Sequence, residues 1–332
     1  MSAVLYRIAR WCATHGWLVV IAWFAVLIVV GGLSRVVAGS PPTTPSLSNT
    51  DSAVAADLIY RAFPGSAAEA TPILMHSDTL DFGNPPDSQV PEDVGSALSA
   101  LPYVSVVQTP AEAPSLVSAD GHTAMVSVTV ADASAGKISV GEEMLATATD
   151  VAGPDIQVAM GGYLGSKLSN PETHMSEILG LIAAILVLYI TMRRVGATMI
   201  PLINALIAVG VGLAGVEIIA NFVFIPDVAP TLGTMLGLGV GIDYALFLVT
   251  RHRMLLRQGY DVPDAAGRTA GTAGAAMIFA GATLIAAVCG LALTGLSFLA
   301  WLGYAAAIVV ACAVAASVTL VPALLGLMQY AV

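Results

Sequence analysis

The chain alternates long apolar runs with one long polar block. Stretches of roughly 20 apolar residues can cross a hydrocarbon core of ~30 Å as helices. One such run precedes the polar block and five follow it. The six runs are Trp17–Val37, Ile178–Met192, Thr198–Ala220, Thr231–Thr250, Gly274–Thr294 and Ala300–Met328. This pattern predicts a polytopic α-helical membrane protein with six transmembrane helices, the first of which is a retained anchor.

The polar block predicts a folded domain. Residues 122–131 begin with HTAMVSVTV, whose alternating β-branched side chains are typical of a strand. Further strands are expected at 70–77, 103–109 and 155–160, with helices at 91–101 and 138–151. The order βαββαβ is that of the ferredoxin-like fold. The predicted parts are the N-terminus with the first helix at 1–38, a porter-like α+β domain at 39–174, and a five-helix bundle at 175–332.

Basic residues orient the predicted helices. Eight of the 12 Lys/Arg fall on one side of the six-helix arrangement, in short segments beside helix ends, where the positive-inside rule applies. They are Arg7, Arg10, Arg193, Arg194, Arg251, Arg253, Arg257 and Arg268. We therefore expect a cell-membrane protein, in the inner or plasma membrane, with both termini cytoplasmic and the α+β domain extracytoplasmic. The stretch at about 251–272 is expected to form a cytoplasmic amphipathic segment, which we interpret as an interfacial helix.

Composition narrows the classes of function. The chain is 57% hydrophobic and only 10% charged, whereas soluble domains average about 25% charged residues. Residues 39–175 hold sixteen of the 22 acidic residues but three of the 12 basic ones, and no basic surface is predicted that would bind nucleic acid. We identify no metal-ligand spacing, nucleophile–base set or phosphate-binding loop, and therefore expect neither an enzyme nor a metal site. His174 and His252 flank helices and are expected at the membrane interface.

The fourth apolar run carries both small and polar residues. Gly233, Gly237 and Gly241 recur every four residues, which places a strip of minimal side chains on one helix face. Another helix can approach such a strip closely. By helical geometry Tyr244 falls on or beside this strip, and Asp243 falls one step round, near Gly239. We therefore expect both polar side chains to face neighbouring helices, with these glycines packing around them.

A carboxylate inside this run needs a physical explanation. Holding an acidic side chain at the centre of a membrane helix costs about 2.5–3.5 kcal/mol on insertion scales. Burial disfavours its charged form, so an acid reached by water from both sides can take up and release protons. The functional hypothesis is a proton relay at Asp243 with Tyr244 as its hydrogen-bond partner. The alternative is a permanently protonated acid bonded to a neighbouring backbone group, to Thr283 or to Thr294.

Three stretches together resemble a known family. They are GLGVGIDYALFLVTRHR at 237–253, TAGAAMIFAGATLIAAVCGL at 272–291 and VTLVPALLGL at 318–327. These residues, and the order helix, outer domain, five helices, resemble one repeat of the MMPL family within the RND transporter superfamily. The resemblance implies export of lipids or other hydrophobic molecules driven by proton uptake, with protons as coupling ion and no other cofactor. It assigns the family's acid and tyrosine to Asp243 and Tyr244.

The chain also departs from the family pattern. Ala275 stands where family members tend to have a basic residue. The family's usual transporter has two repeats with facing Asp-Tyr pairs, whereas this sequence contains one. Self-association into a homo-oligomer, pairing with a separately encoded second half, and a truncated inactive remnant all remain open. Two other hypotheses are a non-transporting accessory protein whose outer domain binds lipid or protein, and a sterol-sensing-type regulatory domain.

Overall fold

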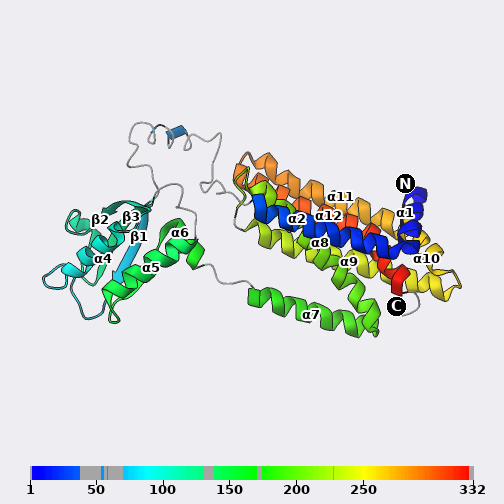
Figure 1. The fold of residues 1–332 in the computed structure, drawn as a ribbon, viewed down its shortest axis with the longest axis horizontal. Helices are drawn as coiled ribbons and strands as arrows, with labels where there is room; N and C mark the ends of the chain where they lie inside the picture. Colours follow the sequence, from blue (N-terminus) through cyan, green and yellow to red (C-terminus); the bar gives the residue numbers. More distant parts are fainter. Residues whose placement is uncertain are drawn as a thin grey trace. The chain divides into compact units, whose positions relative to one another are not determined.

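The chain folds as two compact units. A computed structural model describes residues 2–37, 54, 55, 58, 70–130, 138–169, 174–226 and 228–328. One unit comprises Met1–Asn49 and Thr173–Val332, and the other comprises Thr50–Glu172 (Figure 1). The first is a helical bundle and the second contains a small antiparallel sheet with helices. The side chain of His174 lies outside the described residues.

The bundle consists of long apolar helices. Its helices are α1 (Ser2–Thr14), α2 (Gly16–Val37), α7 (His174–Met192), α8 (Val195–Ala220), α9 (Ala229–Arg257), α10 (Val262–Thr269), α11 (Ala275–Cys289) and α12 (Ser297–Met328). Among the described residues, five helical stretches are long and apolar enough to cross a membrane, and they match five of the six predicted runs. The remaining run, Ile178–Met192, falls in α7, where the apolar helical part Ile182–Met192 is shorter. A sixth spanning helix therefore stays a prediction.

The stretch at 251–272 differs from the single interfacial helix that we expected. Its first residues complete α9, which ends in a Schellman arrangement around Gly259, where φ is 91°. There the Tyr260 amide donates to the Leu255 carbonyl and the Gly259 amide to the Leu256 carbonyl. The chain then starts α10 with Pro263 in its first turn, where a missing N–H costs nothing. A π-helical turn, η2 (Ala270–Gly274), leads from α10 into α11 without a break.

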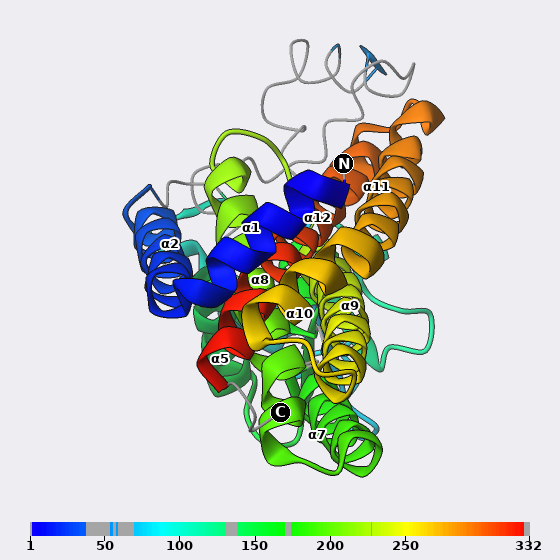
Figure 2. The same cartoon turned by 90° about the vertical axis from the view of Figure 1, so that its right-hand side faces the viewer.

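The helix α1 is a separate element that crosses one end of the bundle over α12 and α10 (Figure 2). Its Tyr6 hydroxyl donates to Asp264 Oδ1 of α10 at 2.5 Å, and Arg268 Nε donates to Asp264 Oδ2 at 2.7 Å. The hydrogen bond to this carboxylate raises the pKa of Tyr6. Gly267 allows the close approach, because a Cβ there would lie 2.8 Å from the Tyr6 ring. Hydrogen bonds and glycine packing together fix α1 to α10.

Close contact between α8, α9 and α12 forms the centre of the bundle. The predicted glycine strip lies in this contact and is buried. A Cβ added at Gly237 would lie 2.5 Å from Val309 Cγ1 and 2.7 Å from Val209 Cγ2. At Gly241 it would lie 3.1 Å from the Cα of Ala205, and at Gly233 3.0 Å from Val309 Cγ2. These three glycines therefore let α9 approach two helices at once.

The second unit has a four-stranded antiparallel sheet in the order β2-β3-β1-β4. Its elements are β1 (Ala70–His76), α4 (Gln89–Ser99), β2 (Val104–Gln108), η1 (Pro114–Leu116), β3 (Thr123–Val130), α5 (Ile138–Ala152), β4 (Gln157–Met160) and α6 (Gly162–Leu168). Each predicted strand and helix has a counterpart whose ends differ by at most two residues. Every second residue of β3 is buried, because its apolar side chains face α4 and α5 across one core. The alternation of buried and less buried residues along β3 therefore determines which face of the sheet packs on the helices.

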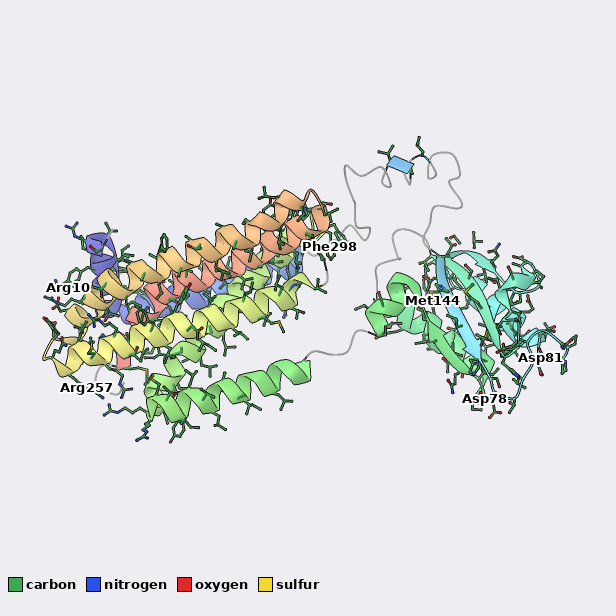
Figure 3. The ribbon with its side chains drawn as sticks, turned by 180° about the vertical axis from the view of Figure 1, so that it is seen from behind. Arg10, Asp78, Asp81, Met144, Arg257 and Phe298 are labelled. Atoms are coloured by element: carbon green, nitrogen blue, oxygen red, sulfur yellow. The ribbon has the colours of Figure 1, made fainter. Side chains whose placement is uncertain are left out.

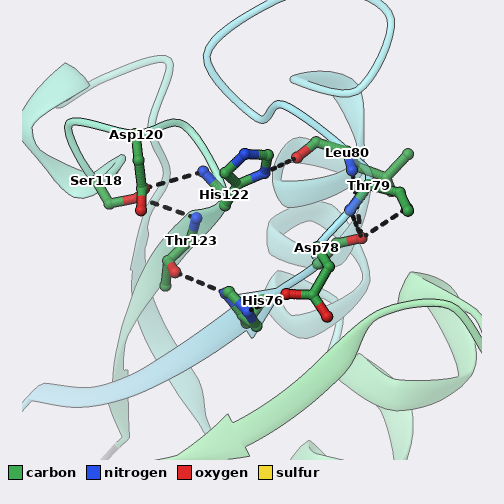
Figure 4. A network of polar contacts seen from close by, with 9 residues as sticks. His76, Asp78, Thr79, Leu80, Ser118, Asp120, His122 and Thr123 are labelled. Carbon is green, nitrogen blue, oxygen red and sulfur yellow. Dashed lines mark hydrogen bonds and ion pairs between the residues drawn. The ribbon is translucent and has the colours of Figure 1, made fainter.

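A polar network holds the loops beside β1 and β3 (Figure 4). The Ser118 hydroxyl donates to Asp120 Oδ1 at 2.5 Å, and the His122 amide donates to the same oxygen at 3.2 Å. The hydrogen bond from Ser118 is the main cause that lowers the pKa of Asp120, followed by the one from the His122 amide. In the neighbouring loop the side-chain amide of Asn84 donates a hydrogen bond to Asp81 Oδ2, which lowers the pKa of Asp81. Carboxylates therefore organise both turns.

The glycine strip gives a direct test of the packing. Gly237→Ala places a methyl group against two valines, and overpacking of this kind costs typically about 1–3 kcal/mol. Gly239→Ala is the matched control, because Gly239 has no atom within 4 Å of the Cβ position and helices favour Ala over Gly. Thermal unfolding in a lipid bilayer is expected to show a lowered midpoint for Gly237→Ala only. Equal midpoints would show that α9 does not depend on this contact.

Acid is expected to loosen the two loops of the second unit. The folded pKa values of Asp81 and Asp120 lie below their unfolded values, so their contribution to stability is present above about pH 4 and is lost as the pH falls through the folded values. Hydrogen-exchange protection of the Gly83 and His122 amides, which donate to these carboxylates, is therefore expected to fall below that pH. Asp120→Asn should remove the pH dependence at His122 and leave it at Gly83. An unchanged pH dependence at His122 in this variant would contradict the assignment.

Candidate functional site

Asp243 and Tyr244 lie near the middle of α9, directly after the buried glycine strip. Asp243 is exposed in this chain, whereas Tyr244 is half-buried against the main core of the bundle. Tyr244 also reaches α11, since its Cε2 atom lies 3.7 Å from the position that a Cβ of Gly281 would take. The glycine contacts with α8 and α12 therefore turn Asp243 toward the open side of α9 and Tyr244 toward α11. The expectation that both side chains face neighbouring helices of this chain holds for Tyr244 alone.

The open side of α9 is a continuous stripe. Met235, Gly239, Asp243 and Phe247 follow one another at four-residue spacing and are exposed. Gly239 has no atom within 4 Å of its Cβ position. The prediction that Gly239 packs with the other glycines is therefore wrong. Gly233, Gly237 and Gly241 pack against α8 and α12, whereas Gly239 lies on the same side of α9 as Asp243. A face with a carboxylate at its centre is thus left uncovered by the described residues.

The two threonines proposed as partners of Asp243 bond elsewhere. Thr283 Oγ1 donates to the Phe279 carbonyl at 2.9 Å, and Thr294 Oγ1 donates to the Leu291 carbonyl at 2.8 Å. Both bonds are local to their own helical segments, which is the usual way that Thr satisfies its hydroxyl in a helix. In the part of the chain that the structure describes, neither threonine is hydrogen-bonded to Asp243.

A buried polar junction close to Asp243 was not predicted from the sequence. Asn204 of α8 is fully buried and donates through Nδ2 to the Gly241 carbonyl at 3.2 Å and to Ser317 Oγ of α12 at 3.0 Å. The side-chain amide of Asn204 thus links three helices, and its contact on α9 is at Gly241, two residues before Asp243. The available signal was an amide in the middle of an apolar run, since polar side chains inside membranes join helices. Its partners lie 37 and 113 residues away, so the contact itself was not predictable from local sequence.

The structure also shows where His252 and Ala275 lie in the bundle. His252 is fully buried inside the bundle, and its expected position at the membrane interface stays a prediction. It is buried because α10 folds back against the end of α9 and covers it. Ala275 begins α11 directly after the π-helical turn and packs, partly buried, against the bundle core. Among the described residues, no group of three His, Cys, Asp or Glu side chains is arranged to hold a metal ion.

This arrangement supports proton chemistry at one carboxyl group. A carboxyl group in the apolar part of a helix can exist neutral or charged, and the medium around it sets the balance. A phenol can donate to a carboxylate or accept from an acid, but Tyr244 is turned toward α11 and no hydrogen bond joins it to Asp243 among the described residues. The Asn204 junction fixes the backbone just before the pair. Within the described residues the site therefore consists of one exposed carboxyl group, with a tyrosine next to it in sequence, on a closely packed helix.

Comparison with known proteins shows which family and which relatives this chain resembles. Residues 44–331 match the MMPL family. The chain is 33% identical over 337 aligned positions to membrane protein YdfJ of Bacillus subtilis strain 168, covering 98% of this chain and 45% of that protein. It is 28% identical to a putative membrane protein of Streptomyces coelicolor, covering 97% of this chain and 46% of that protein. The chain thus spans about half the length of these relatives.

A further relative carries a functional name. The trehalose monomycolate exporter MmpL3 of Mycolicibacterium smegmatis is 30% identical over 181 aligned positions, covering 54% of this chain and 18% of that protein. The family match, the relatives and the apolar helices agree with one another. The chain is a multi-pass membrane protein that belongs to the MMPL family.

Proposed function

We propose that this chain is one half of a proton-driven exporter of lipids or other hydrophobic molecules. The observation that carries the proposal is the exposed Asp243 on the open face of α9. Membership of the MMPL family and the similarity to a trehalose monomycolate exporter support a hydrophobic cargo. The coupling ion is the proton, and the proposed role requires neither a metal nor an enzymatic step.

The position of Asp243 supports a relay across the membrane. It lies fourteen residues from each end of α9, which runs from Ala229 to Arg257. At 1.5 Å per residue, this places the carboxyl group about 21 Å along the helix from either end. A charge moved across the membrane potential gains about 2.3 kcal/mol per 100 mV. A carboxyl group at this depth can use that energy only if water reaches it alternately from both sides.

The uncovered face of α9 supports a paired arrangement. A carboxylate facing lipid is costly, whereas ionisable groups inside membranes usually face a bundle interior or a water-filled cavity. A second MMPL repeat packed on the stripe of Met235, Asp243 and Phe247 would provide such an interior. Coverage of about half of two relatives' length supports this arrangement. The second repeat would come from another copy of this chain in a homo-oligomer, or from a separately encoded second half.

The distribution of arginines supports the orientation. Arg10 and Arg257 lie at one end of the bundle and Phe298 at the other (Figure 3). By the positive-inside rule, the arginine-bearing end would face the cytoplasm, and we propose the plasma membrane as the location. The order of elements in the second unit and its strand order support a ferredoxin-like, porter-like domain. The proposed six-helix topology would make this domain extracytoplasmic. Such a domain would receive the hydrophobic cargo outside the cytoplasm.

The relay is tested by removing the proton-accepting group. In proteoliposomes with an imposed pH gradient, Asp243→Asn should reduce export of a fluorescent lipid to the background rate, because an amide cannot exchange the proton. Glu217→Gln is the matched control, since Glu217 is an exposed acid near the end of α8. Unchanged export by a folded, inserted Asp243→Asn chain would rule out the relay. A wild-type chain that does not export the lipid above background would instead favour a non-transporting accessory role or an inactive remnant.

The Asn204 junction is expected to support the relay indirectly. Asn204→Leu removes both hydrogen bonds to α9 and α12, and Ser317→Ala removes one of them. Interhelical hydrogen bonds in membranes average about 0.6 kcal/mol and reach about 1.7 kcal/mol. Unfolding in bilayers should therefore show a larger loss of stability for Asn204→Leu, with a partial loss of export. Full export together with wild-type stability in Asn204→Leu would show that the junction does not position Asp243.

A further inference from the structure

The bundle contains a large groove that does not include the exposed stripe of α9 on which Asp243 lies. It has a volume of about 1190 Å³ and lies between α2, α11 and α12, with α1 at one end. Ligand pockets in proteins typically measure about 300–1,000 Å³, so this groove is at or above the upper end of that range. Asp243 and its exposed neighbours on α9 are not among the residues that line it.

Small side chains create the space. Ala22 of α2, Ala282 of α11 and Ala311 and Ala315 of α12 line the groove and are exposed in it. Their methyl groups leave room between three helices that larger residues would fill. The remaining wall is apolar, and its polar atoms at Trp23 and Thr319 satisfy one another through a hydrogen bond of 3.0 Å. The walls therefore suit hydrocarbon better than a polar ligand.

One end of the groove is charged. Arg7 of α1 is exposed there, and the described lining residues include no acidic side chain. Beside it Ile8 and Trp11 line the same end and are 38% and 53% exposed. Aromatic and aliphatic side chains next to an arginine are typical of a helix lying at a membrane surface. The groove thus joins an apolar channel to a positive charge at one end.

We propose that this groove binds an anionic phospholipid of the membrane. An acyl chain lies along Ala311 and Ala315 of α12, and the phosphate group pairs with Arg7. Charge complementarity selects the occupant, since basic pockets between transmembrane helices attract anionic headgroups. The lipid would join α1, which Tyr6 ties to α10, to the walls formed by α2 and α11. The site is separate from the proposed transport, because it does not require Asp243 or a moving cargo.

Tryptophan quenching in nanodiscs tests the site in the full chain. Trp11→Phe, Trp17→Phe and Trp301→Phe leave Trp23, which lines the groove, as the sole tryptophan. Small amounts of phosphatidylglycerol with brominated acyl chains are added to phosphatidylcholine, and brominated phosphatidylcholine serves as the comparison. We expect brominated phosphatidylglycerol to quench Trp23 at about a fivefold lower mole fraction, the preference that one arginine supplies near a membrane surface.

Two pairs of variants separate the groove from the surrounding bilayer. Arg7→Gln should abolish the preference for the anionic lipid, whereas Arg10→Gln should keep it, since Arg10 lies on the same helix but does not line the groove. Ala282→Phe should fill the groove and reduce quenching by both lipids, whereas Ala287→Phe, an exposed position outside the lining, should not.

Three results would overturn the proposal. Equal quenching by the two brominated lipids would show that Arg7 selects no headgroup. An equal loss of preference in Arg7→Gln and Arg10→Gln would assign the effect to the general charge of α1. An absence of quenching by either lipid would show that a second copy of the chain or another protein segment occupies the groove.

Discussion

The close contact of α9 with α8 and α12 is the constraint on which the candidate site depends. Gly237 lies against valines of both helices, at distances that leave no room for a Cβ. Because this face of α9 must be buried, the rotation of the helix is fixed. Asp243 is then exposed on one side and Tyr244 points toward α11. The direction of the carboxyl group is therefore a consequence of packing elsewhere on the same helix.

The same constraint motivates the proposal that a second repeat completes the site. The stripe that carries Asp243 is the side of α9 that the glycines do not use, so helices of this chain do not cover it among the described residues. A membrane offers no water to satisfy a charge at that depth. Either the acid is neutral there or another surface with water and polar groups covers it. A second repeat supplies that surface in our account, and protonation supplies the change between the two states.

Local patterns predicted much of the fold, and long-range contacts explain what they missed. Apolar runs identified five helices because burial in a membrane requires only length and composition, and the alternation in HTAMVSVTV identified β3. The glycine period predicted the packing strip but extended it wrongly to Gly239. The burial of His252, the docking of α1 through Tyr6 and the Asn204 junction were not predicted, because each depends on residues far away in sequence.

The central claim is that Asp243 changes its protonation state inside the membrane. Infrared difference spectroscopy of the chain in lipid bilayers measures this directly, because a protonated carboxyl group has its own C=O absorption. Our account predicts a carboxylic-acid band that appears and disappears reversibly as pH is cycled, and that is missing from the Asp243→Asn spectrum. A spectrum in which no such band distinguishes the two proteins at any pH would contradict it.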